Sequence, residues 1–187
     1  MPFVSHRLIV EQKIKTDRTF KTVQPLIYRG KTDTITVPAG FETDFATVPA
    51  VVAWLIERFG TFTAAAVLHD WLCVLLYDAW HSRKYPAMHR EAVVAAISSR
   101  DTDGLFRRVL GELGVDFVTR WLFWTGVRWG ALFNPARRED WIKDAPKVIL
   151  ISALAFPVVA PVTLLALIGR GIVRILRFIT RTRKVAS

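Results

Sequence analysis

The sequence predicts an α+β protein in which a small N-terminal antiparallel β-meander precedes a helical bundle. After the bundle we expect a C-terminal hydrophobic, membrane-spanning helix and a basic amphipathic tail. Three observations support this order: β-branched residues dominate the short segments before residue 38, helical periodicity begins after Pro49, and residues 148–169 carry no charge. The length of 187 residues suits one domain with an appendage.

The β-meander is predicted from three short segments that polar residues separate. Valine, isoleucine, threonine and aromatic residues are enriched in these segments, as is typical of strands. Pro25 has no backbone N–H, so it would place the middle strand at a sheet edge or introduce a bulge. The expected strands are Arg7–Lys15, Thr19–Tyr28 and Asp33–Val37.

The helical bundle is predicted from apolar residues that recur with helical spacing between breaks at Gly60, Gly114 and Asn134-Pro135. The aromatic run 121–124 follows this spacing, and we expect it to pack in the core; a membrane belt or a base-stacking face is the alternative. The expected helices are Ala50–Phe59, Thr63–Tyr77, Met88–Ile97, Asp101–Leu113 and Phe117–Leu132.

A run of 22 residues without charge, Val148–Gly169, predicts a transmembrane helix. At about 1.5 Å per residue the helix would reach about 33 Å, and a bilayer core measures about 30 Å. Pro157 and Pro161 are better tolerated in membranes than in soluble helices. A kinked hairpin helix buried in a protein core is the alternative. We therefore expect a globular body over residues 1–134, a linker over 135–147, the transmembrane helix over 148–169 and the basic tail over 170–187.

Arginines follow the apolar run at spacings of four, three and four, so they form one stripe on a helix with isoleucine and leucine opposite. This pattern predicts an interfacial helix on anionic headgroups, although an ordinary surface helix shows the same pattern. Trp141, just before the run, suits an aromatic anchor at the membrane interface. The arginines of the stripe are Arg170, Arg174, Arg177 and Arg181.

The side of the membrane stays open. The positive-inside rule places the basic C-terminus in the cytoplasm and the body outside. A C-terminal anchor without an N-terminal signal, however, leaves its body in the cytoplasm, and residues 1–13 lack the apolar run of a signal peptide.

The charge distribution argues against nucleic acid as a specific partner. The net charge is +10, but residues 148–187 hold six of the 26 bases and no acid, which leaves 20 bases against 16 acids elsewhere. The excess is therefore concentrated in the tail rather than spread over a binding face. The single cysteine, Cys73, excludes an internal disulfide and a Cys₄ or Cys₂His₂ zinc fold.

Polar residues occur where a helical core would exclude them. His69 and Asp70 lie inside the apolar run 64–76, where a buried carboxylate needs a partner. A second polar group, residues 42–44 with Thr47, lies at the junction between the sheet and the helices. The motifs of nucleotide-binding loops, zincin proteases and α/β-hydrolases are missing from the sequence.

Four ordered segments resemble the motifs of a phage and prophage family, domain of unknown function 1353. Val37–Pro49 is similar to V-P-x-G-F-x-T-D-F/L-A-S/T-V/I-P, and Ala65–Leu72 is similar to A-A-x-L/I-H-D-x-L-Y. Arg100–Phe106 resembles R-x-x-A/T-D-x-I/L-F with one residue fewer, and Arg128–Gly130 resembles the closing V/Y-R-x-F/W-G.

This resemblance covers roughly Ile35–Gly130. Cys73 stands where the family has tyrosine, residues 74–98 look like an insertion, and the C-terminal hydrophobic tail lies outside the family pattern. The resemblance implies a phage or prophage origin and carries no established activity.

The motif residues suit a hydrolytic or a metal site. His69 would act as general base, with Asp44 orienting its imidazole and Asp70 as a further acid. Two carboxylates and an imidazole can also hold a divalent cation, whose identity the sequence leaves unknown. Adjacent residues on a helix point about 100° apart, so one of His69 and Asp70 would face the meander and the other the helix of Arg100 and Asp103.

A structural interpretation stays open for the same residues. In it Arg100 pairs with Asp70, and Asp44 caps the helix that follows. The residues expected in such a binding or structural network are Thr43, Thr47, Arg100, Asp103 and Arg128. A zinc site from His69, Cys73 and His81 is a third interpretation.

We expect a membrane-anchored accessory or virion-associated protein, tail-proximal or lysis-related, whose body binds a phage or host envelope protein. The alternative is a hydrolase that acts on an envelope substrate through His69 and the acids. An open cleft at His69 would favour the hydrolase, and a dry, paired network would favour the binding module.

Overall fold

The computed structural model describes residues 2–4, 8–12, 19–31, 34–44, 60, 62–81 and 97–185. Two compact units divide this part of the chain: the first holds the described residues up to Ile151, and the second holds the helix from Ser152 onward. The expected helix 50–59 and most of the expected helix 88–97 lie outside the described residues.

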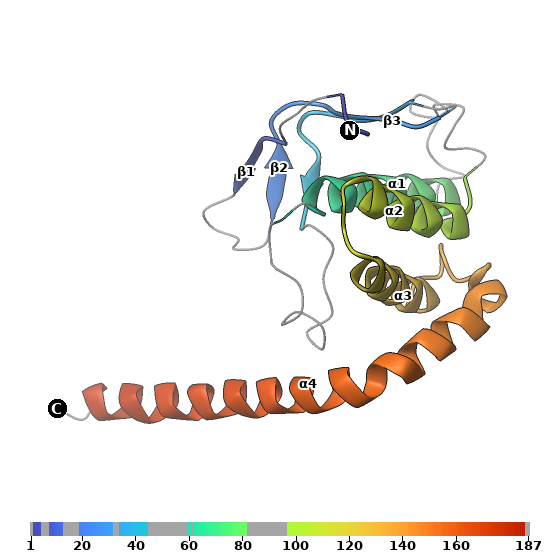
Figure 1. Cartoon of the computed structure of the whole chain (residues 1–187). Coiled ribbons are helices and arrows are strands. Elements are labelled where there is room, and N and C mark those ends of the chain that lie inside the picture. The colour runs from blue at the N-terminus through green and yellow to red at the C-terminus, as the bar shows by residue number, and fades with distance from the viewer. Residues whose placement is uncertain are drawn as a thin grey trace. The chain divides into compact units, whose positions relative to one another are not determined.

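The N-terminal strands of the first unit form two small antiparallel sheets (Figure 1). Phe20 pairs with Thr43 in the three-stranded sheet, whose order is β1-β2-β5, and Tyr28 pairs with Ile35 in the two-stranded sheet β3-β4. The strands are β1 (Val10–Gln12), β2 (Phe20–Thr22), β3 (Leu26–Arg29), β4 (Thr34–Val37) and β5 (Glu42–Thr43).

The strands differ from the predicted meander in two places. The expected strand 19–28 is divided into β2 and β3 around Pro25, which cannot donate a hydrogen bond to a ladder. The short strand β5 lies within a polar segment and has no hydrophobic alternation that would have predicted it.

Among the described residues four helices follow: α1 (Thr63–His81), α2 (Ser99–Glu112), α3 (Phe117–Phe133) and α4 (Trp141–Val185). Ser98 and Asp101 form a capping box at the start of α2, which satisfies backbone N–H groups that the helix itself leaves unpaired. Gly114, with φ of +82°, follows the end of α2, and Asp116 caps α3. Strands followed by helices confirm the predicted α+β class.

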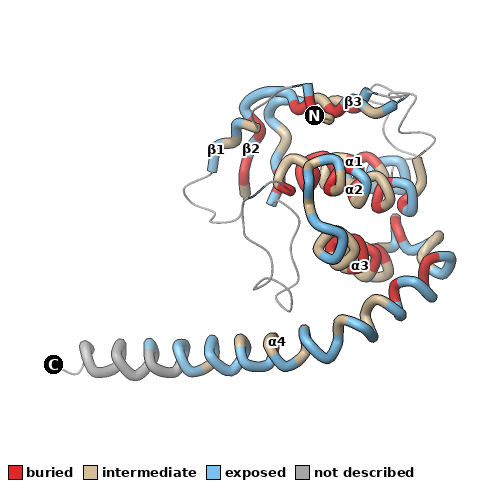
Figure 2. Tube along the Cα trace, viewed as in Figure 1, coloured by how far each residue is buried: buried red, intermediate tan, exposed pale blue. Residues whose placement is uncertain are grey.

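The core of the first unit is formed where α1 contacts β3, β4, β5 and α2, and where α2 contacts α3. Figure 2 shows buried segments on α1, α2 and α3 alternating with more exposed ones. Phe123 and Trp124 are buried as expected, and Phe123 packs edge-on against Phe106 with ring centroids 5.9 Å apart.

Helix α4 begins inside the segment that the sequence led us to expect as a linker. Asp144, Ala145 and Val148 are buried in the first unit, so residues 141–147 are part of its packing rather than a connection. The physical reason is the carboxylate of Asp144, which pairs with arginines of α2 and α3.

The segment Trp141–Arg174 of α4 is long and apolar enough to cross a membrane. Pro157 and Pro161 lie within the helix. Most of this segment beyond Ile151 is exposed in Figure 2, including Leu154, Leu164 and Leu165.

Candidate functional site

The carboxylate of Asp103 on α2 is the centre of a buried ionic network in the first unit. His69 Nε2 on α1 lies 2.7 Å from Asp103 Oδ1, and Arg128 Nη1 on α3 donates to Asp103 Oδ2 at 3.0 Å. Arg137 Nη2 donates to Asp103 Oδ1 as well. The side chains of Asp103 and Arg128 are both 0% exposed, so these charges are neutralised by one another rather than by water.

Arg128 extends the network from Asp103 to a second carboxylate, Asp144 on α4. Arg128 Nε lies 3.4 Å from Asp144 Oδ2, and Arg100 Nε donates to both oxygens of Asp144 at 3.1 and 3.2 Å. Three helices of the first unit therefore meet through two carboxylates and their arginines.

The Arg100–Asp144 pair corrects the expectation that Arg100 binds Asp70. Asp70 follows His69 by one position, about 100° around α1, so the two side chains point to different neighbours. His69 faces α2, whereas Asp70 accepts a hydrogen bond from the hydroxyl of Thr43 on β5.

A turn between β4 and β5 places Thr43 against α1. Gly40 has φ of +83° and donates its N–H to the carbonyl of Thr22, and the N–H of Phe41 bonds the Thr22 hydroxyl at 2.9 Å. The ring of Phe41 then packs on Trp71, with centroids 5.2 Å apart. The turn thus brings the V-P-x-G-F segment onto the helix that carries His69 and Asp70.

The environment of His69 favours its protonated form. Burial alone would lower the pKa of His69, but the neighbouring Cys73 sulfur and the hydrogen bond with Asp103 raise it to about 10. Burial would likewise raise the pKa of Asp103, but His69, Arg137 and Arg128 hold it below its ordinary value. At neutral pH His69 is therefore an imidazolium that donates to a carboxylate.

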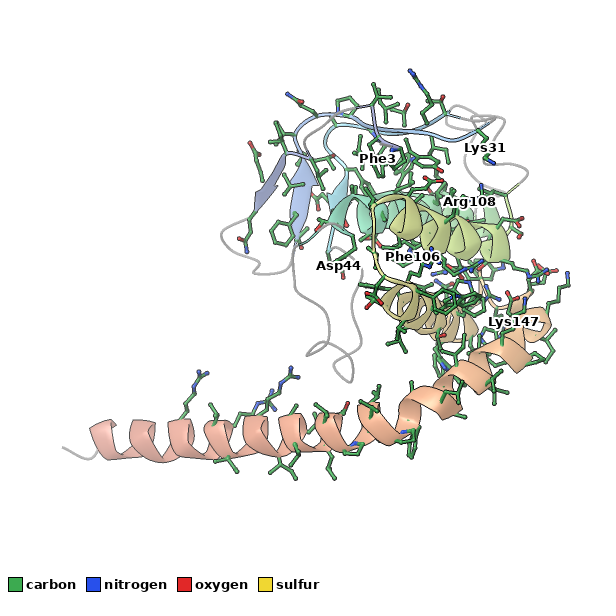
Figure 3. All side chains as sticks on the ribbon, viewed as in Figure 1. Phe3, Lys31, Asp44, Phe106, Arg108 and Lys147 are labelled. Atoms are coloured by element: carbon green, nitrogen blue, oxygen red, sulfur yellow. The ribbon has the colours of Figure 1, made fainter. Side chains whose placement is uncertain are left out.

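This arrangement differs from the expected hydrolytic site. His69 is 4% exposed, its ring packs 4.8 Å from that of Phe106, and its Nε2 is occupied by Asp103. Asp44 is exposed after the end of β5 (Figure 3), and Thr47 lies outside the described residues. A general base needs an unprotonated nitrogen within reach of substrate, and in this structure Nε2 of His69 is bound to Asp103.

The described residues contain no group of three or more histidine, cysteine or acidic side chains that could hold a metal ion. Cys73 Sγ lies 3.7 Å from His69 Nε2 and 3.8 Å from His69 Nδ1, so it is placed beside the ring and not in line with a ring lone pair. The side chain of His81 lies outside the described residues.

Two members of the network, Arg137 and Asp144, were missed by the sequence argument. Both lie in the segment expected to be a linker, where charged residues are ordinary. A signal existed for Asp144: with Val148 it forms an i, i+4 pair in which both residues are buried.

The residues expected at a membrane are placed on α4. Trp141 packs on Trp129 with ring centroids 5.4 Å apart. Arg170, Arg174 and Arg177 are exposed, and the side chain of Arg181 lies outside the described residues.

The sequence model of the family described as protein of unknown function (DUF1353) matches residues 20–127, more than half of the chain. The chain belongs to this family. The DUF1353 match contains Thr43, His69, Asp70, Asp103 and the Gly40 turn, so it includes both the Thr43–Asp70 pair and the His69–Asp103 pair. Arg128, Arg137 and Asp144 follow the DUF1353 match and complete the network from α3 and beyond.

No curated protein and no solved structure matches the chain.

Proposed function

We propose that this chain is a membrane-anchored binding module of phage or prophage type, acting at the host envelope as an accessory or virion-associated component. The observation that carries the proposal is the buried network around Asp103, in which the motif residues pair with one another. Side chains used in this way fix the relative positions of α1, α2 and α3, as a rigid binding body requires.

The same observation argues against the envelope hydrolase. His69 holds a proton and is shielded by Phe106, so a substrate would have to break a buried ion pair to reach it. Breaking such a pair costs about 3–5 kcal/mol before any chemistry begins.

Helix α4 supports the anchor. Large apolar side chains are exposed on it from Ile149 to Val173, and contact with acyl chains would remove them from water. The exposed arginines 170, 174 and 177 follow this apolar run and suit anionic headgroups. The phage or prophage origin and the tail-proximal or lysis-related role rest on the resemblance of the four motifs.

The anchor is tested by comparing the full chain with a chain that ends at Ile151, the last residue of the first unit. The full chain is expected to sediment with membranes and to resist carbonate extraction, and the shorter chain is expected to stay in the supernatant. A matched control, Val158→Arg, keeps the length of α4 but places a charge near the middle of the apolar run, at a cost of about 2.5–3.5 kcal/mol. Equal solubility of the full and shortened chains contradicts the anchor.

The non-catalytic body is tested on cell-wall material by zymography of the purified protein with and without divalent cations. No clearing is expected. Clearing by the parent that disappears in His69→Gln contradicts the binding module and restores the hydrolase.

A further inference from the structure

A second site lies in the first unit, in a pocket of about 630 Å³ between α2, α3 and the start of α4. Five bases line it against three acids. Figure 3 labels two of the bases, Arg108 on α2 and Lys147 on α4. The bases that line the pocket are Arg100, Arg107, Arg108, Arg120 and Lys147.

The acids of this pocket already have partners. Asp101 belongs to the capping box of α2, and Asp144 binds Arg100 and Arg128. Glu112 accepts a hydrogen bond from the hydroxyl of Tyr28 at 3.2 Å. In the described part of the chain Arg107 and Arg120 form no ion pair with an acid.

Arg107 and Arg120 instead stack on aromatic rings and lie close to each other. The Arg107 guanidinium lies 4.0 Å from the centroid of Trp121, and that of Arg120 lies 5.3 Å from the centroid of Phe117. Burial lowers the pKa of Arg107, and the positive charges of Arg120 and Arg108 lower it further. Two guanidinium groups at the same pocket, neither of them paired with an acid in the described part of the chain, give it a positive charge that attracts an anion.

Unused hydrogen-bond donors occur at the same place. Arg107 Nε, Arg120 Nε and Trp121 Nε1 are buried and have no hydrogen-bond partner among the described residues. Buried donors without acceptors are uncommon in folded proteins, because each costs about 1–3 kcal/mol.

Gly111 on α2 makes room for this arrangement. A Cβ atom at Gly111 would lie 2.5 Å from Arg120 Nη1, so an alanine at this position would displace the guanidinium of Arg120 from its present place.

We propose that this pocket binds a phosphate group. Guanidinium forks match the oxygens of phosphate, and the two at this pocket supply enough donors for a tetrahedral anion. At about 630 Å³ the pocket is larger than inorganic phosphate and has room for the rest of a phosphate ester. Lys147 is the last charged residue before the apolar run of α4, which makes a phospholipid headgroup one source and a soluble phosphate ester the other. Binding of a phospholipid headgroup depends on the proposed membrane anchor, whereas binding of a soluble phosphate ester does not.

The test is the thermal unfolding of the full chain in neutral detergent micelles, with inorganic phosphate compared with chloride at equal pH and ionic strength. Phosphate is expected to raise the Tm by about 2–4 °C over chloride. Arg107→Gln with Arg120→Gln should abolish this shift. The matched control Arg29→Gln with Lys31→Gln also removes two positive charges, from exposed positions, and should keep the shift.

Gly111→Ala tests the geometry without changing the net charge. It should displace Arg120 and reduce the phosphate shift, even if the double variant fails to fold. The proposal is overturned if phosphate and chloride act equally on the parent, or if Gly111→Ala and the double variant keep the full shift.

A lipid arm separates the two sources. In nanodiscs, phosphatidylglycerol is compared with phosphatidylcholine, whose choline offsets the phosphate charge. If the Tm is higher in phosphatidylglycerol than in phosphatidylcholine, and Gly111→Ala removes this difference, the ligand is a phospholipid headgroup. If the Tm is the same in both lipids while inorganic phosphate still raises it in micelles, the ligand is a soluble phosphate ester. Because the micelle experiment requires no bilayer insertion, failure of the anchor and failure of the pocket give different results.

Discussion

Three buried ion pairs of the first unit meet at Asp103. It is 0% exposed and accepts from one histidine and two arginines that come from three separate segments. A buried charge of this kind is stable only when its partners are present, and the buried partner charges likewise require the carboxylate of Asp103.

Asp103→Asn should therefore lower the free energy of unfolding by about 3–5 kcal/mol, because it leaves the charges of Arg128, Arg137 and His69 without their shared carboxylate. The isosteric Asp70→Asn should cost about 1 kcal/mol or less, since the amide oxygen still accepts from Thr43. Urea unfolding followed by circular dichroism measures both. Similar losses for the two variants would show that the network is not the main source of stability.

His69 links stability to pH. Its pKa in the folded chain is about 10, above the ordinary value of 6.5, so its charged form stabilises the fold fully below pH 6.5. This contribution is lost as the pH rises through 10. The Tm of the parent should therefore decrease as the pH is raised from 6.5 to 10.

His69→Gln should remove that part of the slope, because glutamine does not titrate in this range. The difference between the two Tm curves therefore reports the charge of His69 together with the groups that interact with it. Parallel curves would mean that His69 is not protonated in the fold.

At the level of elements, the sequence predicted helices better than strands. The bounds of α2 and α3 lie within two residues of those expected, because a capping box, Gly114 and the apolar spacing mark them locally. The strands β2 and β3 were expected as one strand, because the alternation of residues continues across Pro25. That the chain leaves one sheet after β2 and enters the other at β3 depends on the partner strands, β5 and β4, which come later in the sequence.

The sequence identified most residues of the site, but it did not identify which of them form hydrogen bonds and ion pairs with each other. The motifs identified Thr43, His69, Asp70, Asp103 and Arg128, and the helical phase required that His69 and Asp70 face apart. Which neighbour each one meets depends on how α1 packs on α2 and β5, and Asp144 comes from a helix that the sequence suggested would begin later. Tertiary packing determines these pairs, so they cannot be predicted from the local sequence.

For the whole molecule, the position of Asp144 decides where the body ends. A chain that ends at Lys143 should unfold at a lower Tm than a chain that ends at Ile151. Without Asp144 the side chains of Arg100 and Arg128 lose a carboxylate partner, and the buried side chain of Val148 is removed as well. Asp144→Asn in the full chain is the matched control and should reproduce much of that loss. Equal Tm values for the two shortened chains would assign residues 144–151 to the anchor alone.

The pairing of Asp144 with Arg100 and Arg128 has a mechanical consequence. The first turn of α4 is bound to α2 and α3, and the same helix continues without a break to Val185. Any force that pulls the first turn of α4 away from the first unit must therefore separate these buried ion pairs. In mechanical terms, residues 141–147 are part of the body and resist displacement together with it.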